Sequence, residues 1–200
     1  MVITRRTTSK ALRRYQLQVE LADVTPLIWR TVWVEGDFHL GQLHHILQAA
    51  MGWTDAHLHE FNIGGKHYGD PDNDEFDELD IVDESAIQLN AVLKVGLEFE
   101  YQYDFGDSWV HRIRVKASKP LKQSYGAAVV EAGAHACPPE DSGGAYGYQE
   151  FLDGLANNPK DDEVKAFLVW AGKDFDPNLF DRHAANAALL RMAWNAWGKD

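Results

Sequence analysis

The sequence is poor in cysteine and has no long apolar run, since Cys137 is the only cysteine among 200 residues. A lone cysteine excludes an intramolecular disulfide framework, so a reducing cytoplasm is the expected location. No apolar run approaches the ~20 residues of a membrane-spanning helix, and the N-terminus lacks the apolar middle region of a secretory signal. We therefore expect no membrane partner. With seven tryptophans, the chain has ample apolar material for the core of one domain.

Residues 1–14 lack acidic side chains, although the whole chain carries a net charge of −12. The remaining chain is therefore even more acidic, and it would repel a phosphate backbone. We expect a basic flexible arm at 1–14, the only part that would contact nucleic acid, and a single domain at 15–197. An acid-free arm rich in Arg, Ser and Thr is also typical of an organelle transit peptide. The five basic residues are Arg5, Arg6, Lys10, Arg13 and Arg14.

Apolar periodicity predicts an α+β fold with a mostly antiparallel mixed sheet. One helix at 38–51, capped by Asp37 and ended by Gly52, is expected to pack on a face of that sheet. A C-terminal helical part completes the domain, with Asp161 and Asp181 as further caps. The strands are expected within residues 14–34, 57–69, 97–116 and 127–132.

The segment from Tyr103 to His111 is a β-hairpin with an unusual turn. Apolar and polar residues alternate on both sides of it. A tight turn needs a glycine and at most one aspartate for backbone reasons. This turn has Asp104 and Asp107 around Gly106, and a histidine follows two residues after Trp109. These polar groups exceed what the turn requires, so they indicate either a site or aspartates that bind their own backbone.

Six separated motifs occur in one order along the chain: Ile28-Trp29-Arg30, Leu43-His44 through Gly52-Trp53, His57 to Phe61, Tyr103 to His111, Cys137 to Gly144 and Phe175-Asp176-Pro177. Together they resemble the Ri-plasmid ORF-three-like family, some of whose members are labelled transposon-passenger TnpR proteins. The resemblance covers about residues 14–190 and implies an α+β fold, but no settled activity. The TnpR label suggests a resolvase. However, the first strand lacks the nucleophilic serine of serine recombinases, and residues 181–200 are not a basic helix-turn-helix.

Three of these motifs carry imidazole, carboxylate and thiol groups that suit zinc or another divalent transition metal. If the Pro-rich loop folds over the sheet end, the groups would line one polar pocket. The alternative is structural, with histidines in the core and aspartates bonded within their turn. We expect metal ligands at His57, His59, His111 and Cys137. We expect ligand-binding residues at Asp104, Asp107, Trp109, Glu140 and Asp141.

These features allow three functions. The first is a cytoplasmic binding or interaction domain, associated with mobile elements, whose His/Asp pocket takes an unknown protein segment or small molecule. The second is a metal-dependent hydrolase at His57, His59, Asp104, Asp107 and His111, where the metal would activate water. The third is a nucleic-acid accessory factor that acts through the N-terminal arm and is not a serine resolvase. The sequence assigns no catalytic residue.

Overall fold

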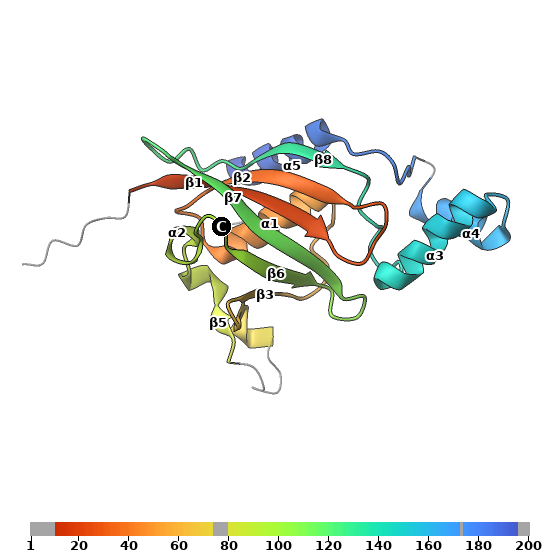
Figure 1. Ribbon diagram of the computed structural model, residues 1–200, viewed down its shortest axis with the longest axis horizontal. Helices are drawn as coiled ribbons and strands as arrows, with labels where there is room; N and C mark the ends of the chain where they lie inside the picture. The colour runs from red at the N-terminus through yellow and green to blue at the C-terminus, as the bar shows by residue number, and fades with distance from the viewer. Residues whose placement is uncertain (1–10, 74–79, 173, 196–200) are drawn as a thin grey trace, which may run out of the picture.

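The computed structural model describes residues 11–73, 80–172 and 174–195 (Figure 1). Residues 1–10 of the predicted arm lie outside them, whereas Arg13 and Arg14, which were assigned to the arm, begin the first strand. Eight strands form one sheet in the order β5-β4-β3-β6-β7-β1-β2-β8. Every neighbouring pair is antiparallel except β4 and β5, so the predicted α+β fold with a mostly antiparallel mixed sheet is confirmed. The strands are β1 (Arg13–Leu21), β2 (Trp29–Glu35), β3 (His59–Ile63), β4 (Lys66–Gly69), β5 (Val82–Asp83), β6 (Glu98–Tyr103), β7 (Trp109–Pro120) and β8 (Val129–Ala134).

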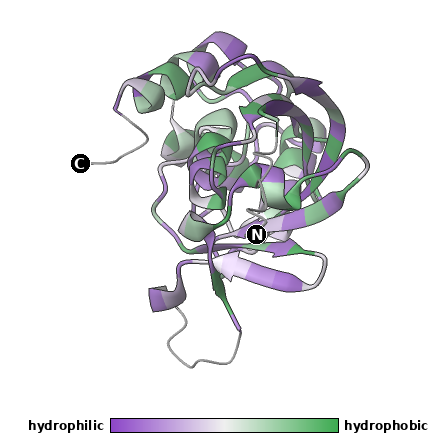
Figure 2. Cartoon of the chain, turned by 90° about the vertical axis from the view of Figure 1, so that its left-hand side faces the viewer, coloured by the Kyte–Doolittle hydropathy of each residue, from purple (hydrophilic) through white to green (hydrophobic). Residues whose placement is uncertain are grey.

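The strands have one buried and one solvent-facing side. In β1 the buried residues are Tyr15, Leu17, Val19 and Leu21, and the residues between them are partly exposed. Figure 2 shows the same mixture of hydrophobic and hydrophilic residues along the strands. Because side chains in a strand alternate between faces, this pattern places the core on the side of the sheet where α1 lies (Figure 1).

The helix α1 (Leu40–Met51) begins two residues later than the sequence suggested. The expected cap Asp37 is wrong, because His39 occupies the N-cap position and accepts a hydrogen bond from the backbone N–H of Gln42. The Gln42 side chain in turn accepts from the His39 N–H, which completes a capping box. At the other end, Gly52 adopts a left-handed conformation with φ 97°, so the predicted stop is confirmed.

The remaining helices are α2 (Leu89–Val92), α3 (Gly144–Asn157), α4 (Asp162–Ala171) and α5 (Arg182–Trp194). Asp161 and Asp181 cap α4 and α5 as predicted. Figure 1 shows α3 and α4 at one end of the molecule, beyond the sheet, and α5 beside β8. Asn186 of α5 both donates to and accepts from the backbone of Val130, so it occupies hydrogen-bonding groups at the edge of the sheet.

Among the described residues, no helix combines the length and the apolarity that a membrane crossing requires.

Candidate functional site

In the turn between β6 and β7, one of the two carboxylate oxygens of Asp104 binds the backbone of the turn. Asp104 is buried and has a positive φ of 56°, a conformation that aspartate tolerates better than most residues. Its Oδ1 accepts hydrogen bonds from the backbone N–H groups of Gly106 and Asp107, at 3.0 and 3.2 Å. Oδ1 of Asp104 therefore has the structural role that the sequence allowed, because it binds the backbone of its own turn. The second oxygen, Oδ2, faces His57 Nε2 at 3.6 Å, so the side chain is fixed with one oxygen still available.

The segment 137–144 lies against this turn. The N–H of Gly143 donates to Asp107 Oδ2 at 3.1 Å, so Asp107 anchors the loop. The indole Nε1 of Trp53 donates to the carbonyl of Pro138 at 2.9 Å. At Gly144 the backbone approaches so closely that a Cβ atom would lie 2.5 Å from the carbonyl oxygen of Asp107. The Pro-rich loop thus packs over the sheet end, beside residues 53–57.

Glu140 fastens the loop through its carboxylate. Its Oε1 accepts from the hydroxyl of Tyr103 at 2.6 Å, and Thr54 donates to it through both Oγ1 and the backbone N–H. Partial burial opposes ionisation of Glu140, but the hydrogen bonds from Thr54 and Tyr103 outweigh it and lower the pKa of the carboxyl. Burial and this same bond raise the pKa of Tyr103. The predicted ligand-binding residue Glu140 therefore already has its acceptor capacity largely used within the protein.

The side chains of His57, Asp104 and Asp141 converge near the hydrogen bonds of Glu140. His57 Nε2 lies 3.3 Å from Asp141 Oδ1 and 3.6 Å from Asp104 Oδ2, and these three atoms lie within 4.8 Å of one another. The side chain of Asp104 is 10% exposed, that of His57 29% and that of Asp141 71%, so the group opens toward solvent. The three residues come from three separate segments that the hairpin, the loop and residues 53–57 bring together. We call them the His57 group.

A second cluster, which the sequence did not reveal, forms around Asp55 of the segment 53–57. Asp55 contacts His44 Nε2 at 2.6 Å and His45 Nδ1 at 3.1 Å, one with each carboxylate oxygen. These bonds lower the pKa of Asp55, while burial lowers the pKa of His44. The other ring nitrogen of His44 shares a hydrogen bond with the Tyr101 hydroxyl at 2.8 Å. We call His44, His45 and Asp55 the His44 group.

His59 belongs with the His44 group rather than with His57. Its ring stacks on His44 with centroids 3.4 Å apart, and its Nε2 contacts Glu84 at 3.0 Å. The sequence placed His57 and His59 on one face of a strand, but β3 begins at His59, and His57 precedes it. The strand periodicity therefore does not extend to His57, which is free to turn toward Asp104.

The distances between the polar atoms differ between the His57 group and the His44 group, and they indicate different chemistry. Metal–ligand bonds of about 2.0–2.2 Å in a tetrahedral site place the ligand atoms about 3.3–3.6 Å apart. The two contacts of His57 have these separations and are long for hydrogen bonds. The contact of 2.6 Å between His44 and Asp55 is a short hydrogen bond. The separations in the His57 group are therefore compatible with two ligands of one ion, whereas His44 and Asp55 are already joined by a direct hydrogen bond.

His111, Cys137 and Trp109 lie outside both groups of ligand atoms found among the described residues. His111 is wholly buried, and this burial lowers its pKa to about 4. Cys137 is partly exposed as a residue, yet desolvation outweighs the effect of nearby Arg30 and raises the pKa of its thiol to about 12. A neutral thiol is a poor nucleophile and a poor metal ligand. Trp109 is 1% exposed and packs in the core.

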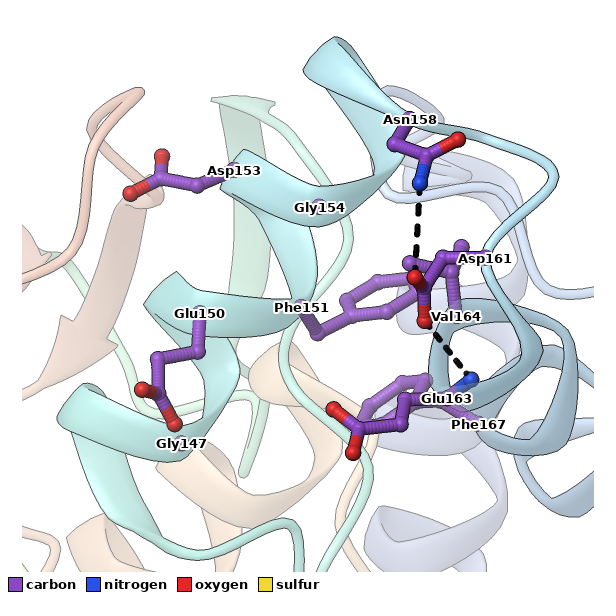
Figure 3. A pocket seen from close by; sticks show the side chains of 10 residues that line it. All are labelled: Gly147, Glu150, Phe151, Asp153, Gly154, Asn158, Asp161, Glu163, Val164 and Phe167. Carbon is purple, nitrogen blue, oxygen red and sulfur yellow. Dashed lines mark hydrogen bonds between the residues drawn. The ribbon is translucent and has the colours of Figure 1, made fainter.

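A separate hollow of about 470 Å³ lies between α3 and α4. Figure 3 shows the rings of Phe151 and Phe167 within it and carboxylates around it. Asp161, the most central acid, already accepts hydrogen bonds from Asn158 and from the N–H of Glu163. The hollow shares no lining residue with the His57 group or the His44 group.

The chain is similar to known proteins over a range that includes every segment of the candidate site. The sequence profile of plasmid pRiA4b ORF-3-like proteins matches residues 13–184. The uncharacterized protein y4hQ of Sinorhizobium fredii (strain NBRC 101917 / NGR234) is 40% identical over 179 residues, which are 89% of this chain and 89% of that protein. The crystal structure of MM3350, a protein of unknown function from Methanosarcina mazei Go1, has a TM-score of 0.75 and 33% identity. The match covers 87% of this chain and 98% of that one.

Proposed function

This chain belongs to the plasmid pRiA4b ORF-3-like family, and we propose that it is a binding protein that holds one divalent transition-metal ion between His57, Asp104 and Asp141. The observation that carries the proposal is that three ligand atoms converge within 4.8 Å of one another, with both carboxylate oxygens 3.3–3.6 Å from His57 Nε2, separations that suit metal ligands. One imidazole with two carboxylates suits zinc or manganese.

The supporting shell favours a preformed site. Asp104 is held by two backbone N–H groups through the oxygen that does not face His57. The loop bearing Asp141 is fastened at Glu140, Gly143 and Pro138. Outer contacts of this kind orient metal ligands and strengthen binding. With three protein ligands, an ion would keep at least one position open for a carboxylate, phosphate or carbonyl oxygen of a partner.

Binding fits this arrangement better than hydrolysis. A metal-dependent hydrolase needs a free general base beside the metal-bound water. Glu140, the nearest additional carboxylate on the loop, already accepts three hydrogen bonds from Thr54 and Tyr103. His59 and His111, which the hydrolase hypothesis required, lie outside the His57 group. A cytoplasmic location and an association with mobile elements remain parts of the proposal, resting on the lone cysteine and the family's plasmid name.

Isothermal titration of the metal-free protein with Zn²⁺ and with Mn²⁺ tests the proposal. We expect one site, and we expect Asp104→Asn to weaken it by about 100-fold or more, because even outer-shell changes cost 10–100-fold. This variant keeps an Oδ1 for the turn and loses only the charged second oxygen. Asp55→Asn is the matched control, since it removes a carboxylate from the His44 group. Absence of binding, or weakening by Asp55→Asn alone, would overturn the proposal.

A further inference from the structure

Arg30 is a buried cation without an anionic partner. Only 1% of the residue is exposed. No carboxylate of the described residues lies within salt-bridge distance of its guanidinium. Buried charges in proteins are almost always paired with an opposite charge, whereas the contacts of Arg30 are with neutral groups.

The hydrogen bonds of Arg30 account for three of its five N–H donors. Nε donates to the carbonyl of Ala50 at 2.9 Å, and Nη1 donates to those of Trp29 and Ala134, each at 2.8 Å. Ala50 lies in the last turn of α1, where the helix dipole favours a cation. The ring of Phe180 lies 3.8 Å from Cζ. The two donors on Nη2 have no partner among the residues that the structure describes.

Arg30 also lines a cavity of about 320 Å³ between the end of α1, residues 136–137 and α5. The other walls are mostly apolar, with Met51, Phe175, Leu179 and Ala188 among them. Among the described residues that line it, Asp181 is the one acid, and its Oδ1 already accepts from the N–H groups of His183 and Ala184. A small apolar cavity with one oriented polar group is the usual form of a small-molecule site, toward the lower end of the about 300–1,000 Å³ range.

We propose that this cavity binds a small amphipathic monocarboxylate, whose carboxylate pairs with Arg30 Nη2 and whose hydrocarbon part packs against Phe175, Leu179 and Ala188. Arg30 Nη2, the guanidinium nitrogen without a hydrogen bond to the described residues, offers enough donors for one singly charged carboxylate. A phosphate dianion would need more donors than the cavity supplies. The site shares no residue with the His57 group, so it stands independently of metal binding.

Calorimetric titration of the purified chain with octanoate tests the proposal, with 1-octanol as the uncharged analogue. We expect octanoate to bind with one-to-one stoichiometry and octanol to bind at least about tenfold more weakly, a difference of about 1.4 kcal/mol. Ala188→Phe should fill the cavity and weaken the binding of octanoate, also by at least about tenfold. The matched control is Ala187→Phe, an exposed position on the same helix that does not line the cavity.

Failure of octanoate to bind would overturn the proposal, as would equal binding of octanol, which would show an apolar cavity with no anion requirement. Unchanged affinity in Ala188→Phe would place the octanoate elsewhere. Should that variant not fold, Ala184→Phe, at a second lining position on α5, replaces it in the same comparison.

Discussion

The hydroxyl of Tyr103 donates to Glu140 Oε1 at 2.6 Å, and it joins the end of β6 to the loop that carries Asp141. The same oxygen accepts from the backbone N–H groups of Ala56 and His57, at 2.9 and 3.3 Å. One atom therefore connects the hairpin, the Pro-rich loop and the segment that holds His57. These are the three segments whose side chains form the His57 group.

Tyr103→Phe should lower the free energy of unfolding by about 1–3 kcal/mol, because two backbone donors and a partly buried carboxylate each lose one partner. Urea unfolding followed by tryptophan fluorescence measures the change. Tyr146→Phe is the control, since that side chain is 77% exposed and its loss of a hydroxyl should be nearly neutral. Equal stability of the two variants would show that the hydroxyl of Tyr103 does not join the segments.

Gly144→Ala should displace the loop. Gly144 has φ 68°, which costs alanine about 1–2 kcal/mol by itself. The added Cβ would also lie 2.5 Å from the carbonyl oxygen of Asp107, so the backbone must move. Gly126→Ala has a similar φ of 62° and nothing within 4 Å, and it isolates the conformational cost. We expect the first variant alone to weaken metal binding, and equal metal affinities would contradict a role for this close approach.

Burial of His111 should make stability depend on pH. Its pKa of about 4 in the folded protein lies below the usual 6.5, so between these values the unfolded chain binds more protons. Stability is therefore fully retained above about pH 6.5 and falls toward pH 4. Relative to His111→Gln, which does not titrate, the native protein should lose about 2 kcal/mol more between pH 7 and pH 5. Parallel pH profiles in denaturant unfolding would show that His111 is protonated normally when folded.

Arg30→Met should destabilise the protein by roughly 2–4 kcal/mol, although methionine fills a similar volume. The substitution removes a buried charge, but it leaves the carbonyls of Trp29, Ala50 and Ala134 without this donor. Thermal and urea unfolding measure the loss. A variant as stable as the native chain would mean that desolvation of the guanidinium cancels its hydrogen bonds.

The sheet was largely predictable because its side chains follow a period of two. In β1 from Tyr15 on, in β6 and in β7 as far as Val115, every second residue is buried, so periodicity found these strands. The helix start was missed because a histidine cap is less common than an aspartate cap, and Asp37 precedes the helix by only a few residues. The partner strands of β1 could not be read from the sequence, since pairing depends on contacts between distant segments.

The candidate site was predictable only in part. The sequence singled out the hairpin turn and the loop, which lie side by side in the fold, but it could not show that His57 turns to Asp104 while His59 stacks on His44. That division depends on where β3 begins, which is the least certain feature of a predicted strand. The pairing of Asp55 with His44 and His45 was missed because eleven and ten residues separate them with no motif. Arg30 appeared only as part of a family motif, and its burial and unpaired nitrogen are visible only in three dimensions.

Crystals of the protein grown with Zn²⁺, with anomalous diffraction recorded at the zinc absorption edge, test the metal site most directly. We expect one strong anomalous peak about 2.0–2.2 Å from His57 Nε2, Asp104 Oδ2 and Asp141 Oδ1. The absence of a peak there, or a peak within the His44 group instead, would contradict the assignment of the His57 group as the metal-binding site.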